Sequence, residues 1–83
     1  MLAVGKCKFD KNVSNKMRTD SVFKKDLSYA LFSHTVGIWD ENNEKHLQEV
    51  KNNKRVTAIF PTACGNIVID TLADRTKTFI RMA

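Results

Sequence analysis

The chain has little glycine, proline and cysteine, and these shortages narrow the kinds of protein that it can be. Among its 83 residues there are three glycines, one proline and two cysteines. Cys7 and Cys64 are too few for a disulfide framework and form no Cys-x-x-Cys pair. We therefore expect reduced thiols in a cytoplasmic setting, packed as small hydrophobic groups. A bridge between them would require that the fold bring the two thiols together.

Long apolar runs are also missing from the sequence. No segment approaches the roughly 20 apolar residues that a membrane-spanning helix needs, and the first eight residues lack the apolar region of a secretory signal. Hydrophobic residues make up 42% of the chain and charged residues 28%, which is typical of a folded globular protein. The sequence predicts a single domain over residues 1–83, with no membrane segment.

Acidic residues are scarce in the first third of the chain only. The formal net charge is +5, and the stretch from Met1 to Lys25 carries seven basic residues against Asp10 and Asp20, whereas the remainder is balanced. A local basic surface favours encounter with an anionic partner such as nucleic acid or an acidic protein face, although it can equally serve solubility. The candidate binding residues of this surface are Lys6, Lys8, Lys11, Lys16, Arg18, Lys24 and Lys25.

Apolar residues at helical spacing predict a long helix from Thr19 to Val36. Thr19 or Asp20 can cap its N-terminus, and Gly37 can end it in a left-handed conformation. His34 ends the apolar stripe, and we interpret it as a buried, hydrogen-bonded histidine, since no second metal ligand lies three or four residues away.

A second, more polar helix is predicted from Asp40 to Asn52, with acidic residues at its start and basic residues at its end. His46 in this helix is expected to be exposed. Trp39 just before it is expected to close one edge of the core, the alternative being an anchor at a binding interface.

Three runs rich in β-branched and aromatic residues predict an antiparallel meander, with strands at Arg55–Phe60, Asn66–Thr71 and Lys77–Met82. Pro61 is expected to end the first strand and Gly65 to take a positive φ in the hairpin loop. The middle run is apolar on both faces, which indicates a central strand.

The first nine residues alternate weakly and predict a short strand or an extended arm. The polar segment Asp10–Arg18 predicts a turn, the alternative being a short helical turn with Val13 and Met17 pointing inward. The predicted fold class is therefore α+β, with a three- to four-stranded antiparallel sheet and two helices packed on one face. The expected core residues are Phe23, Leu27, Leu31, Trp39, Ile59, Ile67, Ile69 and Ile80.

Several segments together carry a resemblance to a known family: Leu31, His34, Gly37 and Trp39, then Arg55–Phe60 and Gly65–Thr78. Over about the last two-thirds of its length, the chain resembles a family of small, mostly uncharacterised proteins carried by bacteria, plasmids and prophages. Members typically show a Gly-Asp-Trp-Gly segment and a C-terminal Ile-Trp-Ile-Ile-Thr-Glu-Ala-Asp-Arg-Ser-x-Thr-Thr segment. The resemblance implies residence in a phage or mobile element more than it implies a reaction.

This sequence departs from the family pattern at four positions. Ile38 and Asp40 replace the Asp and second Gly of the first segment, and Val68 and Leu72 replace the Trp and Glu of the second. The family motif nevertheless retains Asp74, Arg75, Thr76 and Thr78. Asp74 and Arg75 are candidate binding residues, against the simpler interpretation of a structural turn.

The sequence offers little support for catalysis. It contains no glycine-rich phosphate loop, no recognisable nucleophile motif and no spacing typical of metal ligands, so we predict no enzyme activity, no cofactor and no metal. Our leading hypothesis, by analogy with other small mobile-element proteins, is an inhibitor of host defence, of the anti-CRISPR or anti-restriction type, that binds a host protein or nucleoprotein complex. The alternative is a nucleic-acid-binding accessory protein that uses the basic N-terminal third. The sequence specifies neither the partner nor the oligomeric state.

Overall fold

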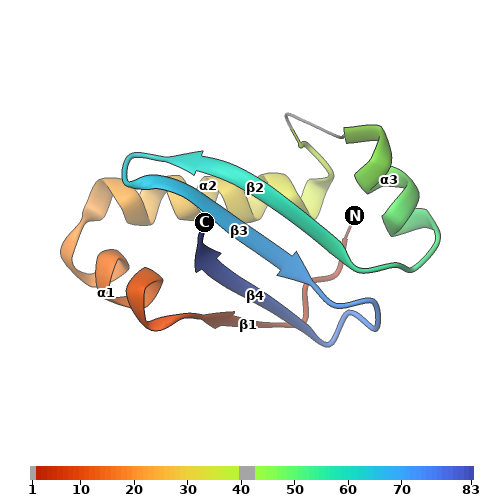
Figure 1. Ribbon diagram of the computed structural model, residues 1–83, viewed down its shortest axis with the longest axis horizontal. Helices are drawn as coiled ribbons and strands as arrows, with labels where there is room; N and C mark the ends of the chain where they lie inside the picture. Colours follow the sequence, from red (N-terminus) through yellow and green to blue (C-terminus); the bar gives the residue numbers. More distant parts are fainter. Residues whose placement is uncertain (1, 40–42) are drawn as a thin grey trace.

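Regular structure begins at Lys6 and ends at Met82 in the computed structural model, which describes residues 2–39 and 43–83 (Figure 1). The chain forms one strand first, then a run of helices, and finally a meander of strands. The elements are β1 Lys6–Phe9, α1 Lys11–Thr19, α2 Ser21–Val36, α3 Asn43–Lys51, β2 Val56–Thr62, β3 Gly65–Thr71 and β4 Lys77–Met82. The α+β class predicted from the sequence is confirmed.

Aspartate side chains start the first two helices. The Asp10 carboxylate accepts from the Val13 backbone N–H, and Asp20 accepts from the N–H groups of Val22 and Phe23, which have no partner within the helix. The Asp10 cap explains why the segment predicted as a turn or a short helical turn is a full helix, α1. Gly37 ends α2 with φ of 81°, as predicted.

The predicted second helix corresponds to α3. Its end at Lys51 agrees with the prediction to within one residue. Its predicted start at Asp40 lies outside the described residues.

The sheet has the strand order β1-β4-β3-β2. The pairs β2–β3 and β3–β4 are antiparallel, so the predicted meander is confirmed, and β3 is an inner strand. The prediction of a wholly antiparallel sheet is wrong, because β1 pairs with β4 in parallel. The intervening helices carry the chain back across one face, which allows the first and last strands to run in the same direction.

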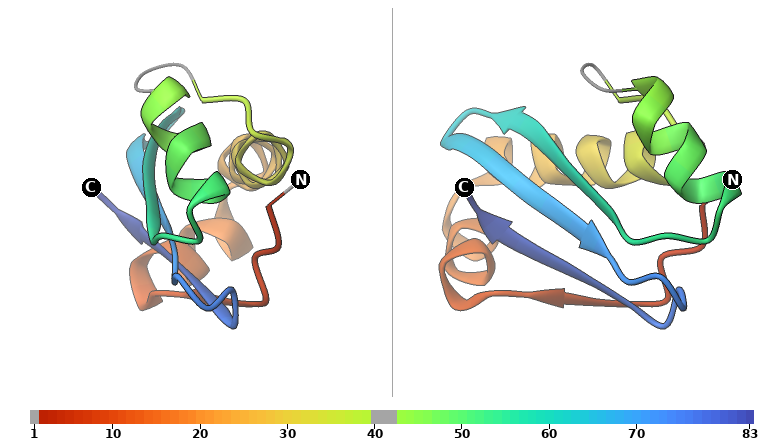
Figure 2. Two further views of the ribbon diagram at one scale, coloured as in Figure 1. Left: turned by 90° about the vertical axis from the view of Figure 1, so that its right-hand side faces the viewer. Right: turned by 45° about the vertical axis from the view of Figure 1, so that its right-hand side comes forward.

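The helices gather on one face of the sheet, as the end-on view shows (Figure 2). Strand side chains on that face form the core with α1 and α2, and Phe23, Leu27, Ile67, Ile69 and Ile80 are almost completely buried. Trp39 belongs to this core, as predicted. Two core predictions need correction: Leu31 is only partly buried, and Ile59 is 62% exposed because it lies on the opposite face.

The N-terminal arm is fixed beside the β3–β4 turn by a close backbone approach. Gly5 has φ of 60°, and a Cβ atom there would lie 2.4 Å from the backbone of Thr76. The Lys6 N–H donates to the Thr76 carbonyl, and the Leu2 N–H donates to the Thr35 carbonyl. Glycine at position 5 thus allows β1 to enter the sheet next to β4.

Candidate functional site

The free edge of β2 presents backbone groups that point away from the sheet. The Ala83 N–H donates to the Asn66 carbonyl and the Leu72 N–H donates to the Lys77 carbonyl, so the even-numbered residues of β3 face β4. Hydrogen bonding alternates along an antiparallel strand, which leaves the odd-numbered residues of β3 to bond β2. By the observed register, Thr57, Ile59 and Pro61 are therefore the residues of β2 that face outward.

These outward groups have no backbone hydrogen-bond partner within residues 2–39 and 43–83. Thr57 and Ile59 each offer an N–H and a C=O, whereas Pro61 offers only a C=O. The prediction that Pro61 ends the strand is wrong, because β2 continues to Thr62. The Pro61 nitrogen faces the free edge, where the sheet needs no N–H donor. The edge can accept one further strand.

A hollow of about 600 Å³ adjoins this edge, between α2 and the end of β2. Its walls are mainly apolar and include side chains that are unusually open to solvent: Tyr29 is 73% exposed, Ile38 59% and Val22 57%. Phe60 and Pro61 of β2 also line it. Apolar side chains gathered in a concave site beside an unpaired strand are typical of surfaces that bind another polypeptide.

α2 carries a second apolar stripe that the prediction of a single buried face did not include. Val22, Tyr29 and Phe32 lie at i, i+7 and i+10, outside the stripe that enters the core, and all three are exposed. The helical spacing alone gives this signal, since a helix with two apolar stripes has one more than a single core can cover.

The hairpin that closes one end of the hollow is tied to α2. The Asp26 carboxylate accepts from the Ala63 backbone N–H at 2.8 Å, and the Cys64 thiol lies 3.4 Å from a carboxylate oxygen of Asp20. Partial burial, with the hydrogen bond to Asp20, raises the pKa of the Cys64 thiol. Cys64 and Cys7 are both free thiols and both half-buried. The tether holds the β2–β3 hairpin and α2 in a fixed relation, so the hollow is preformed.

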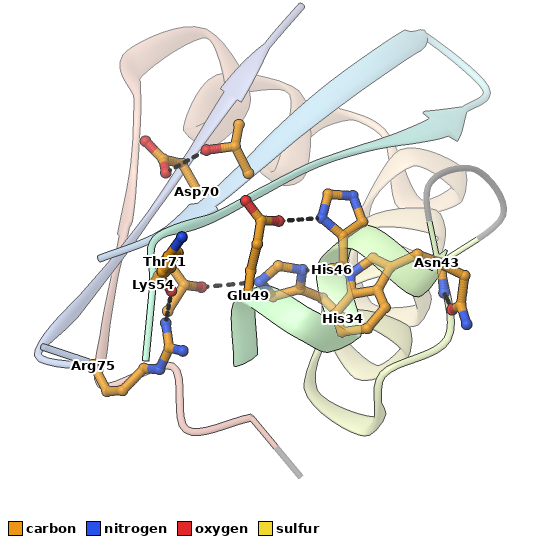
Figure 3. Close-up of polar contacts among 10 residues, drawn as sticks. His34, Asn43, His46, Glu49, Lys54, Asp70, Thr71 and Arg75 are labelled. Atoms are coloured by element: carbon orange, nitrogen blue, oxygen red, sulfur yellow. Dashed lines mark hydrogen bonds and ion pairs between the residues drawn. The ribbon is translucent and has the colours of Figure 1, made fainter. Parts of the chain in front are cut away.

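A chain of hydrogen bonds with one fixed direction connects α2 to the sheet, and Figure 3 shows its link between His34 and Thr71. The Trp39 indole N–H can only donate, so Nδ1 of His34 is the acceptor, at 3.1 Å. The neutral His34 ring then carries its proton on Nε2 and donates to Thr71 Oγ1 at 2.9 Å. Thr71 donates to Thr78, whose hydroxyl donates to the Val4 carbonyl. His34 is thus the buried, hydrogen-bonded residue that the sequence predicts.

Protonation of His34 would place a second N–H against the Trp39 N–H. Burial is the main cause that lowers the pKa of His34 to about 4, helped by the positive charges of His46 and Arg75. The side chain is fully buried and both ring nitrogens are occupied. Its role is to connect α2 to the sheet and to the N-terminal arm.

His46 contradicts its prediction as an exposed residue, because only 6% of it is accessible. Its ring packs on Trp39, with ring centroids 5.2 Å apart, and its Nδ1 lies 2.8 Å from the Glu49 carboxylate (Figure 3). This packing attaches α3 to the core through Trp39. The prediction of an exposed His46 is wrong because His46 lies on the same inward face of α3 as Val50.

Asp74 and Arg75 form a turn with local hydrogen bonds. The Asp74 carboxylate accepts from the backbone N–H and the hydroxyl of Thr76, and Arg75 has φ of 61°. The Arg75 guanidinium donates to the carbonyls of Lys54 and Leu72. These contacts hold the β3–β4 turn against the start of β2 and correspond to the structural interpretation of the motif.

The predicted basic surface does not lie on one element. Lys6 and Lys8 belong to β1, whereas Lys11, Lys16 and Arg18 lie on α1 and Lys24 and Lys25 lie on α2. Lys25 lines the hollow. The strand register places Lys6 and Lys8 beside Lys77 and Phe79 of β4. Residues from opposite ends of the sequence are therefore neighbours in the sheet, and the sequence pattern does not predict this pairing.

In the part of the chain that the structure describes, no cluster of three or more histidine, cysteine, aspartate or glutamate side chains is arranged to hold a metal ion. Among the described residues, no helix combines the length and apolar character needed to cross a membrane.

Comparison with known proteins adds no relative. The chain matches no family model, no curated protein and no solved structure. The fold and the site define it as a small α+β protein with a preformed hollow beside a free strand edge.

Proposed function

We propose that the protein acts by binding another polypeptide, without catalysis of its own, through the hollow between α2 and the free edge of β2. The observation that carries this proposal is the coincidence of two independent features. Unpaired backbone groups of Thr57 and Ile59 lie next to exposed apolar side chains of α2. The backbone groups would provide affinity and the hollow would provide selectivity, which is how strand-addition sites work.

The two edges of the sheet support this assignment by contrast. β1 spans four residues and carries Lys6 and Lys8, whereas β2 spans seven residues without a charged side chain. Short, lysine-bearing edge strands resist pairing with other chains, while long uncharged ones invite it. β2 is therefore the edge that a partner strand would join.

The side chains that line the hollow indicate which kind of partner segment it would bind. An added strand would place alternate side chains into the hollow, where Tyr29 and Phe60 require apolar groups. Lys25 makes no ion pair with any described residue, whereas Asp26 already accepts from Ala63. We therefore expect an extended, largely apolar segment with an acidic residue near Lys25.

The groups that a small nuclease would use support the absence of catalysis. His34 is buried with both ring nitrogens bonded, and His46 pairs with Glu49. Asp74 and Arg75 bond the backbone of their own turn and of Lys54. None of these groups converges on the hollow with another.

The resemblance to proteins of phages and plasmids suggests which partners to test first. We propose a host protein complex, in particular a defence complex of the restriction or CRISPR type, as the source of the partner segment. Occupation of an exposed strand or groove in such a complex would inhibit it without any chemistry.

Photo-crosslinking from the hollow tests the proposal. Tyr29 is replaced by a photoreactive phenylalanine analogue, the chain is expressed in bacteria, and the irradiated cells are searched for covalent adducts. We expect a discrete adduct whose crosslinked peptide has the extended, apolar and acidic character described above. The same analogue at Gln48, an exposed position of α3, serves as the control and should not yield that adduct.

A second variant tests strand addition itself. Ile59→Pro removes an outward N–H that β3 does not use, so the sheet retains its internal hydrogen bonds. Loss of about one backbone hydrogen bond to the partner should weaken binding roughly fivefold. Equal adducts from positions 29 and 48, or an adduct unaffected by Ile59→Pro in a chain that remains folded by circular dichroism, would reject the proposal.

A further inference from the structure

The face of the sheet opposite the helices, here called the open face, is defined by the strand register. Lys6 and Lys8 of β1 lie beside Lys77 and Phe79 of β4, and Arg81 lies beside Val68 of β3. Val68 in turn lies beside Ile59 of β2. The side chains of the outer strands and of β4 on this face are exposed. The open face comprises Lys6, Lys8, Thr57, Ile59, Val68, Asp70, Lys77, Phe79 and Arg81.

Four basic side chains gather on the open face. Lys6, Lys8, Lys77 and Arg81 form no ion pair with any described residue, and the net charge of the whole chain is +5. The acidic residue of this face, Asp70, is almost fully buried and paired with Arg55. That ion pair lowers the pKa of Asp70 and keeps its charge balanced. An anion approaching the open face therefore meets four cations and no free carboxylate.

An aromatic ring lies among these cations. Phe79 is 38% exposed on an inner strand of the sheet. Lys8 is its neighbour across the strands, roughly 5 Å away at the backbone, and Lys77 and Arg81 flank it along β4 at roughly 7 Å. Val68, which is buried, separates this ring from Ile59 of β2, which is exposed.

We infer that the open face binds single-stranded nucleic acid, with the four cations contacting phosphates and a base stacking on Phe79. Alternating cations and an exposed ring on a sheet provide both parts of such a site. A duplex keeps its bases stacked and cannot use the ring, so a single strand gains more. An acidic protein face would use the charges and leave Phe79 without a matching group. This inference concerns a different face from the hollow and does not depend on the proposed function.

The test is fluorescence anisotropy with labelled 20-nucleotide poly(dT) and poly(rU) across a salt series. If all four cations contact phosphates, the logarithm of the association constant should fall with the logarithm of salt concentration with a slope of about −3. A 20-base-pair duplex of mixed sequence should bind at least about tenfold more weakly than the single strands, because its bases are stacked on one another and none is free to stack on Phe79.

Two variants separate stacking from charge. Phe79→Leu keeps an apolar side chain and removes the aromatic face, and affinity should fall about 5- to 150-fold. Lys8→Glu with Arg81→Glu should weaken binding roughly tenfold or more and make the salt slope shallower by about 1.4. The matched control, Lys24→Glu with Lys45→Glu, makes the same change of net charge on two helices and should retain the wild-type slope.

Four results would overturn the inference. One is the absence of binding at about 50 mM salt, where phosphate contacts are strong. Another is equal weakening by the two double charge reversals. The third is wild-type affinity of Phe79→Leu. The fourth is displacement of the single strand by polyglutamate at equal charge, which would point to an acidic protein instead. A Tyr29→Glu variant should bind the single strand normally, so failure here is separable from failure at the hollow.

Discussion

The polar groups on the two faces of the sheet differ in whether they bond within the protein or remain exposed to solvent. On the covered face, Thr71 and Thr78 are fully buried and every hydroxyl is used within the protein, in the chain that begins at Trp39 and ends at Val4. On the open face, the side chains of Lys6, Lys8, Lys77 and Arg81 are exposed and have no acidic partner among the described residues. Groups that bond one another contribute to the fold, whereas charged groups left to solvent remain available to a partner.

Apolar residues follow the same division. Ile69 is fully buried on the covered face, and Ile59 is 62% exposed on the open face, although their strands are neighbours. One residue type therefore serves two purposes, depending on which side of the pleat it occupies. Substitutions at matched positions on the two faces should therefore differ in their effect on stability.

The largest effect is expected from the same substitution made on the two faces. Ile69→Ala should lower the free energy of unfolding by about 2–5 kcal/mol, because it removes buried methyl groups and leaves a cavity. Ile59→Ala should cost less than about 1 kcal/mol, since most of its side chain already contacts water. Urea unfolding of the two variants gives both values, and similar losses would show that the open face is covered in solution.

Between pH 6.5 and pH 4.5, above the ordinary pKa of aspartate, the main pH dependence of stability should arise from His34 on the covered face. The pKa of His34 is about 4 in the folded protein and about 6.5 in the unfolded chain. Between these values the unfolded chain binds a proton that the folded protein does not, so stability falls as the pH falls from 6.5 to 4. The loss is about 3 kcal/mol if His34 remains neutral throughout. Urea unfolding at pH 7, 5.5 and 4.5 measures it.

His34→Gln is the control for this pH dependence. The glutamine side chain can accept and donate hydrogen bonds but does not titrate, so the variant should be less stable at pH 7 and should lose less stability on acidification. A wild-type protein whose stability is flat from pH 6.5 to pH 4.5 would contradict the assignment of the neutral ring.

On the open face, the ion pair between Arg55 and Asp70 should have a moderate effect. Arg55→Ala leaves a carboxylate that is 3% exposed with only Thr57 as a side-chain partner, which should cost about 1–3 kcal/mol. Arg81→Ala, which breaks no ion pair with a described residue, should cost less than about 0.5 kcal/mol. Equal effects of the two variants, measured by thermal unfolding, would mean that the pair does not stabilise the buried carboxylate.

Local patterns in the sequence predict the elements well but not their partners. The bounds of β4 and the left-handed ends at Gly37 and Gly65 follow from residue preferences along the chain. The parallel pairing of β1 depends on where the helices return the chain, and on the close approach at Gly5, and neither is a local property. The sequence predicts at most a short helical turn where α1 spans Lys11–Thr19, because the helix depends on the Asp10 cap and on the packing of Val13 in the core.

The candidate sites were predictable only in part, for the same reason. The exposed stripe of α2 through Tyr29 is readable from helical spacing, yet nothing local places it beside the edge of β2. Lys6 and Lys8 belong to the predicted basic surface, but Lys77 and Arg81, which share the open face with them, lie some 70 residues later in a region of balanced charge. Long-range register creates the open face, and single-sequence patterns do not contain that register.

The smallest effect should come from reversing one charge on the open face. Lys6 and Lys77 are direct neighbours across β1 and β4, and like charges in that position repel. Lys77→Glu should therefore stabilise the protein by about 0.5 kcal/mol, an effect that 1 M salt should reduce. The same variant should weaken binding of single-stranded poly(dT), because it removes a phosphate contact. A gain in stability coupled to a loss of binding is expected where unpaired charges are kept for a partner, whereas a loss of both would indicate that Lys77 stabilises the fold.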